Sequence, residues 1–407
     1  MPFPHNLLPR VNILLLLYMR KNLFLCSICC LLSFYSFSQS EYPIFKDTAT
    51  LQPQDSGKLS LSIDNLNYLR NYEWFGKIPL SYTLLGNLLT PQLKYQLNDK
   101  ISFKGGIMLR REFGRPGYVT VEPVFTAKYQ KKGLTFLMGT LEGGPNHRFI
   151  EPLYNIERFI QGHMARVGEN EVQKASRSRN EQGLQLKLDN KRFWMDWFID
   201  WRESIIVDDP FREQLNTGFS TRTILVNRPN FKIELPAQLT ISHHGGQISS
   251  DTNSIESLMN TALGLSFQIT NPGAFIKGIS MDHYFAYYRN ISGNKQQLYN
   301  RGTGWLSTLT LKSRLNIDLD LRYWRGHQFY SPLGMPLYNS ISEKRIGYGE
   351  PERELFFATF IYNKQLFNNV AIDMRLEPYY DLGNRKLEYG YSVFLRFNKD
   401  FFLKRLR

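Results

Sequence analysis

The regular alternation of apolar and polar side chains is the feature that most limits the fold of this sequence. Residues 315–323 read LNIDLDLRY, with apolar residues at every odd position and Asn, Asp or Arg at every even position. Side chains of a β-strand point alternately to the two faces of a sheet, so this segment predicts a strand with one apolar and one charged face. The pattern recurs in residues 101–110, 184–189, 193–202 and 387–397. We expect a sheet that separates an apolar medium from a wet one.

A sheet of this kind can be a soluble sandwich or a barrel in lipid. A sandwich buries its apolar faces against each other, whereas a membrane barrel turns them outward and keeps the polar face inside. The 407 residues have a mean hydropathy of -0.35, and beyond the N-terminus there is no apolar run of about 18 residues that would predict a membrane helix. Half of each barrel strand is polar, so low hydropathy is compatible with a barrel. We predict an all-β protein that forms a single transmembrane antiparallel β-barrel.

The number of alternating segments sets the expected size of the barrel. We expect 16 strands, within a range of about 14 to 18, and bacterial barrels of this kind have an even number. The segments lie near residues 59–70, 80–97, 101–112, 118–130, 134–142, 182–189, 192–203, 212–225, 231–244, 258–270, 275–289, 302–313, 314–326, 353–364, 368–380 and 385–397.

The connections between these segments alternate in length. Short turns rich in Asn, Asp, Gly and Pro, such as residues 98–100 and 271–273, alternate with long segments, such as 143–181 and 327–352. Short turns of outer-membrane barrels face the periplasm and long loops face outward. We therefore expect periplasmic termini and extracellular long loops.

The first 38 residues resemble a signal peptide that is removed after export. Arg20 and Lys21 precede an apolar run that ends in small residues, and the stretch from Met19 is complete by itself, so Met19 is an alternative start. The three cysteines all lie in this segment, so we expect no disulfide in the mature chain. The remaining organisation is predicted as a periplasmic N-terminal segment at 39–58, the barrel at 59–398 and a basic tail at 399–407.

Charge and motifs exclude several classes of function. Removal of the signal peptide lowers the formal charge from +14 to +11, and the basic residues are scattered, so we expect no nucleic-acid partner.

His243 and His244 are adjacent on one strand and point to opposite faces, so we expect no metal and no cofactor. The serine-hydrolase, metalloprotease, P-loop and dinucleotide fingerprints are absent. Asp318 and Asp320 share a face but fit an alternating charged lumen, and we predict no catalytic residue and no enzymatic activity.

Aromatic residues near strand ends, among them Tyr68, Tyr72, Trp74, Trp305 and Trp324, are typical of a girdle at the membrane interface. With the alternating strands and the segregated loops, the chain resembles outer-membrane β-barrels of Gram-negative bacteria, and its expected strand count resembles the general porins. That resemblance implies an outer-membrane location, contact with membrane lipid and lipopolysaccharide, insertion by the barrel-assembly machinery, transport of small hydrophilic solutes and, as one expectation, a homotrimer.

The longest loop, 143–181, follows the fifth expected strand, and in porins that loop narrows the pore. By this resemblance we expect a pore constriction formed by His147, Arg148, Glu151, Glu157 and Arg158, with a short amphipathic helix that begins near Glu151. An ordinary external loop over the barrel mouth is the alternative. The parity of a residue, that is, whether it falls on the polar or the apolar side of its alternating strand, predicts the face on which it lies. Parity assigns acidic and basic residues to the lumen in nearly equal number. The site candidates among them are Lys104, Glu122, Lys187, Asp196, Asp200, Asp318, Asp320, Arg322, Asp373 and Arg375.

The sequence therefore predicts a porin-like passive channel for small hydrophilic solutes. The alternative is a non-conducting surface barrel whose outer loops bind a glycan, a capsule polymer or a protein partner. The charges on the lumen face are equally compatible with an open pore and with ion pairs that fill the interior.

Overall fold

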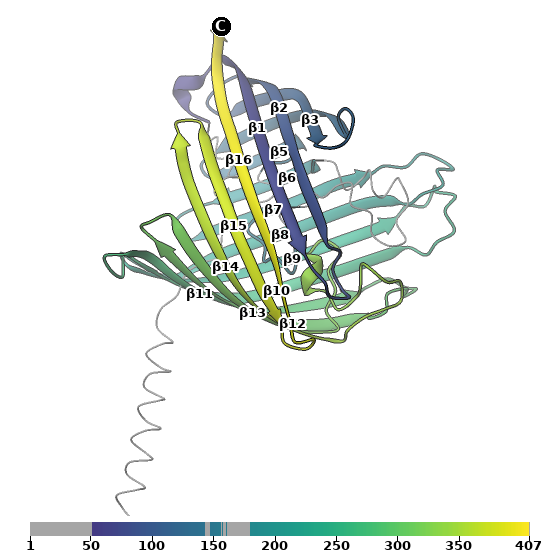
Figure 1. Ribbon diagram of the computed structural model, residues 1–407. Coiled ribbons are helices and arrows are strands. Elements are labelled where there is room, and N and C mark those ends of the chain that lie inside the picture. The colour runs from purple at the N-terminus through teal and green to yellow at the C-terminus, as the bar shows by residue number, and fades with distance from the viewer. Residues whose placement is uncertain (1–50, 143–146, 156, 158–159, 161–179, 407) are drawn as a thin grey trace, which may run out of the picture.

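The computed structural model describes residues 51–142, 147–155, 157, 160 and 180–406. Sixteen antiparallel strands follow each other in sequence order around a closed barrel, and β1 pairs with β16 to complete it (Figure 1). The predicted fold class and strand count are confirmed. The strands are β1 (Lys58–Glu73), β2 (Tyr82–Gln96), β3 (Ile101–Glu112), β4 (Thr120–Lys131), β5 (Leu134–Thr140), β6 (Gln182–Asp189), β7 (Phe193–Glu203), β8 (Glu213–Arg228), β9 (Phe231–Gly245), β10 (Glu256–Thr270), β11 (Ile276–Asn290), β12 (Arg301–Ser313), β13 (Ile317–His327), β14 (Glu352–Phe367), β15 (Val370–Asp381) and β16 (Lys386–Arg405).

The two faces of the barrel wall differ as the alternation of the sequence requires. In β4, Val121 and Phe125 are exposed on the outer face, whereas Glu122 and Thr126 are buried inside. Leu263 is 57% exposed at the centre of β10, and its neighbour Ala262 is buried. An apolar surface of this extent around a closed sheet is stable in lipid, where no water contacts it. The chain is therefore an outer-membrane-type β-barrel.

Connection length differs between the two ends of the barrel. The connections after β2, β4, β6 and every later even-numbered strand up to β14 are short. Most of those after odd-numbered strands are longer, and the two longest follow β5 and β13. The turn between β4 and β5 has only two residues, Lys132 and Gly133, with φ of 49° and 83°. Two positive φ values define the primed turn that matches the twist of a hairpin, and glycine adopts them without steric cost.

The strand boundaries differ from expectation mainly at the C-terminus. β16 continues through the residues expected to form a basic tail, and Lys399 to Arg405 pair with the first part of β1, where Lys58 lies opposite Arg405. Figure 1 shows this strand extending beyond its neighbours at the end of the barrel that carries the C-terminus. Pairing with β1 satisfies backbone groups that a free tail would leave to water. The expected signal peptide and most of the segment 39–58 lie outside the described residues.

The expected aromatic girdle is only partly on the outer face. Trp305 is 45% exposed, but Tyr68, Tyr72, Trp74 and Trp324 are buried inside the barrel. Proximity to a strand end does not determine the face on which a side chain lies, because parity does. Within the described residues, no helix is long and apolar enough to cross a membrane.

Candidate functional site in the barrel interior

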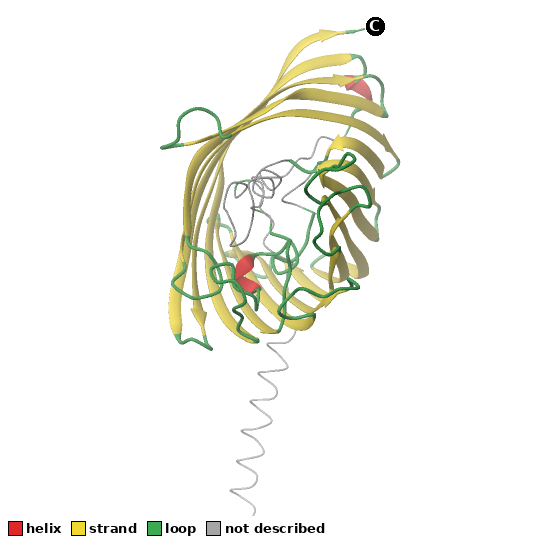
Figure 2. Cartoon of the chain, turned by 90° about the vertical axis from the view of Figure 1, so that its right-hand side faces the viewer, coloured by secondary structure: helices red, strands yellow, loops and turns green. Residues whose placement is uncertain are grey.

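Residues 147–155 lie inside the barrel and are held by its wall. The Oγ of Ser220 on β8 donates to the carbonyl of His147 at 2.5 Å. Gln238 on β9 binds the segment twice, since its Oε1 accepts from the Ile150 N–H at 3.0 Å and its Nε2 donates to the Arg148 carbonyl at 2.8 Å. These lumen-facing side chains supply hydrogen bonds that an irregular backbone cannot make by itself. Figure 2 shows loop segments within the space that the strands enclose.

The connection between β13 and β14 packs against this segment. The Asn155 N–H donates to the carbonyl of Leu333 at 2.7 Å, and the Met335 N–H donates to the carbonyl of Glu151 at 2.8 Å. Aromatic and aliphatic side chains of both segments join lumen-facing rings in one buried cluster. We call residues 147–155 together with residues 328–340 the plug.

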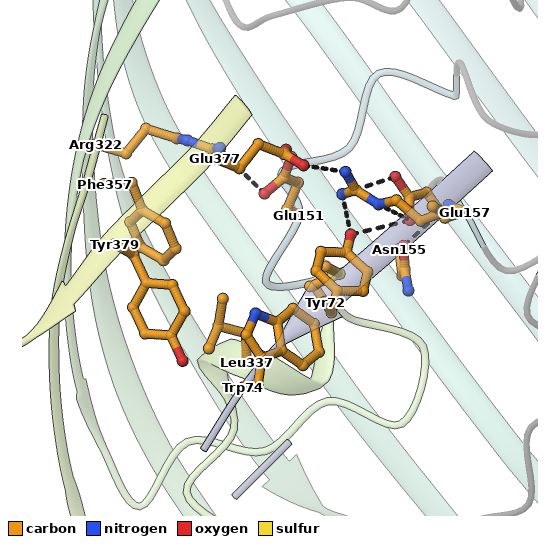
Figure 3. Close-up of a pocket in the computed structure, with 12 residues that line it drawn as sticks. Tyr72, Trp74, Glu151, Asn155, Glu157, Arg322, Leu337, Phe357, Glu377 and Tyr379 are labelled. Atoms are coloured by element: carbon orange, nitrogen blue, oxygen red, sulfur yellow. Dashed lines mark hydrogen bonds and ion pairs between the residues drawn. The ribbon is translucent and has the colours of Figure 1, made fainter. Parts of the chain in front are cut away.

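A small pocket lies between the plug and the barrel wall, with a cavity volume of about 20 Å³, which is room for about one water molecule. Figure 3 shows that charged groups and aromatic rings surround it. Ten of its lining residues come from four strands and both plug segments, and the other two are Trp74, which follows β1, and Glu157, which lies just beyond the first plug segment: Arg70, Tyr72, Trp74, Glu151, Asn155, Glu157, Arg322, Met335, Leu337, Phe357, Glu377 and Tyr379.

Arg70 of β1 holds one group of charges at this pocket. Its Nε donates to Glu157 Oε2 at 3.0 Å, and its guanidinium also forms an ion pair with Glu377 of β15. The Tyr72 hydroxyl donates to the same Glu157 oxygen at 3.0 Å. Arg70 and Glu157 are each only 1% exposed. Burial raises the pKa of the Glu157 carboxyl, although the positive charge of Arg70 opposes this shift.

Arg322 of β13 holds the second group and links both plug segments to the wall. Its guanidinium forms an ion pair with Glu151 and donates to the Tyr338 hydroxyl at 3.2 Å. Tyr338 in turn donates to Glu151 Oε2 at 2.9 Å. The other guanidinium nitrogen donates to Thr359 Oγ1 on β14 at 2.8 Å. A buried ion pair needs such additional hydrogen bonds to offset the loss of hydration.

His147 lies between two carboxylates at the opposite side of the interior. Its Nδ1 is 2.8 Å from Asp196 Oδ2, and its Nε2 is 2.9 Å from Glu181 Oε2. The ring stacks on Phe198, with centroids 4.2 Å apart, and is 1% exposed. Burial alone would lower the pKa of His147, but the charges and hydrogen bonds of Asp196 and Glu181 outweigh it and raise the pKa to about 9. His147 is therefore protonated and donates both ring hydrogens to these carboxylates near neutral pH.

Three of the predicted constriction residues, His147, Arg148 and Glu151, lie in the plug and Glu157 lies just beyond it, with one difference in local structure. His147, Glu151 and Glu157 contact the lumen face, and the Arg148 guanidinium lies over the Trp194 ring, 4.3 Å from its centroid. Arg158 lies outside the described residues. The helix expected from Glu151 does not begin there, because residues 151–153 form a turn and residues 154–155 are irregular. The carbonyls of this stretch accept hydrogen bonds from the second plug segment instead of from a following helical turn.

The lumen candidates lie on the inner face, as parity predicts. They are buried or half-buried: Lys104, Glu122, Lys187, Asp196, Asp200, Asp318, Asp320, Arg322, Asp373 and Arg375. Many are in ion pairs with neighbours, as Lys104 is with Glu142 at 2.6 Å. Their role in solute passage stays a prediction. Arg70 was not predicted, although its alternation with Tyr68 and Tyr72 is a signal that could have placed it inside.

The pocket combines carboxyl groups, guanidinium groups and aromatic rings around one small cavity. Its carboxyl groups differ in environment, because Glu157 is fully buried and Glu151 is partly exposed. Within the described residues, no group of three or more His, Cys, Asp or Glu side chains is placed to hold a metal ion.

Solved structures with a similar fold include outer-membrane proteins. They include OmpT of Vibrio cholerae in its trimer form, with 8% identity, a TM-score of 0.47 and coverage of 85% of this chain and 100% of that chain. OccAB3 of Acinetobacter baumannii has 8% identity, a TM-score of 0.48 and coverage of 84% and 99%. OprD of Pseudomonas aeruginosa has 9% identity, a TM-score of 0.46 and coverage of 90% and 98%. These values are too low to transfer a property to this chain. No curated protein matches the sequence.

The family comparison corrects one expectation. Residues 51–406 match the model of a family described as lipid A 3'-O-deacylase-type. A deacylase is an enzyme, so the prediction that the chain has no enzymatic activity is contradicted. The absence of short catalytic motifs was a weak argument, because neighbouring barrel strands bring together residues that are far apart in the sequence. The match spans all sixteen strands, and the chain therefore belongs to the lipid A 3'-O-deacylase-type family.

Proposed function

We propose that the protein is an outer-membrane esterase that removes an ester-linked acyl chain from a glycolipid of the lipid A type. The observation that carries this proposal is the family match over residues 51–406. The outer face of the barrel supports it, because an enzyme that is itself immersed in lipid meets an acyl ester by lateral diffusion, without extraction of the substrate from the membrane.

The experiment is deacylation of lipid A in vesicles that contain the refolded protein. We expect mass spectrometry to show lipid A that has lost one acyl chain and an equal amount of released fatty acid. Heat-unfolded protein in the same vesicles is the control. Unchanged lipid A in the presence of protein with verified β-rich folding would refute the proposal.

The proposal includes an orientation in the membrane. We infer an exported protein of a Gram-negative bacterium, with a signal peptide at residues 1–38, periplasmic termini and extracellular long loops. The end with longer connections then faces the outer leaflet, where lipopolysaccharide resides. A protease added to intact cells should cut the connection 204–212 or 246–255 and leave the short turns uncut.

Passage of small hydrophilic solutes is a second candidate function, favoured by the ionisable groups on the lumen face. In that function His147, Arg148, Glu151 and Glu157 would form the constriction. Single-channel conductance in planar bilayers tests this for the full chain and for a variant that lacks residues 147–178. Conductance that rises after the deletion would support a constricted channel, and silence from both folded proteins would exclude it. Chemical cross-linking of the same samples tests for a homotrimer.

A further inference from the structure

Two arginines lie side by side where β11 ends and β12 begins. Arg289 is the last residue but one of β11, Arg301 is the first residue of β12, and the two are directly opposite in the register of the strands. Opposite residues of antiparallel strands have Cα atoms about 5 Å apart, and like charges at such positions are destabilising. An anion bound between the two guanidinium groups would remove this repulsion.

Both arginines are on the outer face of the barrel wall. Arg289 is exposed between Tyr288 and Asn290, which are buried on the inner face. Arg301 is exposed and is followed by the buried Gly302. Alternate residues of a strand lie on opposite faces, so the arginine pair faces the medium around the barrel and not the plug.

The charges of this pair are not compensated by a neighbouring acidic residue. Within the part of the chain that the structure describes, no carboxylate forms an ion pair with either arginine. Lys94 and Lys104 are also directly opposite each other, on the lumen face. There Lys94 contacts Asp400 at 3.0 Å, and Lys104 contacts Glu142 at 2.6 Å. The chain thus supplies its own anions to the opposed lysines and not to the opposed arginines.

The neighbouring strands carry balanced charge on the same outer face. Arg325 of β13 lies directly opposite Glu354 of β14. Two residues further along, His327 lies opposite Glu352 and contacts its carboxylate. On the outer face of β11 to β14, the positive charge without an acidic residue opposite it is therefore at the arginine pair.

The arginine pair lies at the depth expected for lipid headgroups. Each arginine is six residues from the middle of its strand, a rise of about 20 Å along the strand. A strand tilted by about 45° converts this rise to about 14 Å along the membrane normal, and half of the apolar band of such a barrel is about 12 Å. The ten-residue connection 291–300 joins the two strands at the end with the longer connections.

An apolar surface lies closer to the middle of the barrel on the same face. Leu263 of β10 lies opposite Phe285 of β11, which lies opposite Trp305 of β12. Their side chains are 57%, 50% and 45% exposed. Phe285 and Trp305 are each four residues from the arginine of their own strand. A ligand that fits both surfaces has an anionic head and apolar chains directed toward the membrane interior.

We propose that Arg289 and Arg301 bind a phosphate group of an outer-leaflet glycolipid whose acyl chains contact Leu263, Phe285 and Trp305. Guanidinium groups offer a fork of N–H donors that matches the oxygens of a phosphate, and such charge-assisted hydrogen bonds are strong. The inference rests on the outward orientation of the long connections, which is part of the proposed function. It does not require that the bound lipid is hydrolysed.

The first test measures binding of lipid A that carries two phosphates to the refolded full chain in detergent micelles, by native mass spectrometry. Arg289→Gln and Arg301→Gln should each weaken binding by about tenfold or more, because each removes charge-assisted hydrogen bonds. Lipid A from which both phosphates have been removed should bind to the wild type as weakly as phosphorylated lipid A binds to these variants.

Arg111→Gln is the matched control. Arg111 is also an exposed arginine one residue before the end of its strand, but it lies opposite Asn87 and not opposite another cation. This variant should bind lipid A as the wild type does. Equal binding by all four proteins would overturn the inference. Loss of an acyl chain changes the mass of the lipid but not its phosphates, so the same spectra report the esterase function separately.

A second measurement uses the temperature at which heating changes the gel migration of the protein. In detergent without lipid, Arg301→Glu should raise this temperature, because a glutamate opposite Arg289 replaces repulsion by attraction. Added lipid A should raise it for the wild type and not for Arg301→Glu, since a ligand that binds the folded state stabilises it. An equal rise in both proteins would place the lipid elsewhere. A lower lipid-free temperature in Arg301→Glu would show that the arginines do not repel each other, and either result would refute the site.

Discussion

Charges in the lumen are balanced within small groups of residues. Arg70 contacts two carboxylates, Glu157 and Glu377. Arg322 forms an ion pair with Glu151 and also donates hydrogen bonds to the hydroxyl groups of Tyr338 and Thr359. Removal of one partner from a buried pair leaves an uncompensated charge, which costs about 3–5 kcal/mol. The Arg322 group therefore specifies where the plug contacts the wall, and the Arg70 group does so for Glu157 just beyond it.

His147 should make the stability of the protein dependent on pH. An unperturbed histidine has a pKa of about 6.5, and the pKa of His147 in the folded protein is about 9. Its stabilisation is therefore fully present below about pH 6.5 and is lost as pH rises through about 9. We expect this contribution to the free energy of unfolding, about 3 kcal/mol, to disappear between about pH 6 and pH 10.

Urea unfolding of the protein in lipid vesicles at several pH values measures this effect. His147→Gln serves as the comparison, because glutamine retains hydrogen-bonding capacity but does not titrate in this range. The variant should show a smaller loss of stability over the same pH interval. An equal pH dependence of the two proteins would contradict the role assigned to His147.

The alternation along a strand predicted the face on which a side chain lies more reliably than the type of the residue did. It placed Asp196 and Arg322 inside and Ile317 outside, as the structure has them. The prediction that Trp324 belongs to the aromatic girdle at the membrane interface was wrong, because it used only the residue type, and Trp324 lies inside the barrel. The contacts of Arg70 with Glu157 join residues 87 positions apart, and no local pattern encodes such a pairing.

At the scale of elements, the contact between the two plug segments depends on a glycine. A Cβ at Gly334 would lie 2.0 Å from the Pro152 carbonyl oxygen, and this oxygen belongs to the backbone and cannot rotate away. Gly334→Val should separate the segments and lower the free energy of unfolding by about 1–3 kcal/mol. Faster proteolytic cleavage within residues 328–340 would report the change.

Gly293→Val is the matched control for this substitution. It lies in the connection between β11 and β12 and has no atom within 4 Å of the Cβ position. Its stability and cleavage rate should equal those of the wild type. Equal rates in all three proteins would show that the two segments do not depend on each other.

The last part of β16 should contribute to closure of the barrel. Lys399 to Arg405 pair with β1, from Ile63 back to Lys58, and a chain shortened after Asn398 would leave that edge without its partner. We expect a lower temperature for the heat-induced change in gel migration, because unpaired strand edges are unfavourable in or near lipid. A chain that lacks only residues 406–407 is the control. The same temperature for both shortened chains would refute a role in closure.

Element positions followed from the sequence more fully than element ends. Alternation predicted all sixteen strands, but it did not predict the extension of β16, because Asp400 to Leu403 do not alternate strictly. The plug was expected as a loop inside the barrel only through resemblance to porins. Its irregular backbone has no periodicity from which its path could be derived.

For the whole molecule, the apolar outer face should determine stability in lipid. Leu263 is at the middle of β10 and faces outward, whereas Ile269, which alternation places on the same face, is the last residue but one of that strand. An arginine on the lipid face costs about 2–4 kcal/mol at the middle of the bilayer and about 0–1 kcal/mol near the interface. Leu263→Arg should therefore reduce the free energy of folding into vesicles by about 2–4 kcal/mol, and Ile269→Arg should reduce it by at most about 1 kcal/mol. Equal effects of the two substitutions would mean that β10 does not cross the bilayer at the depth inferred from its position in the strand.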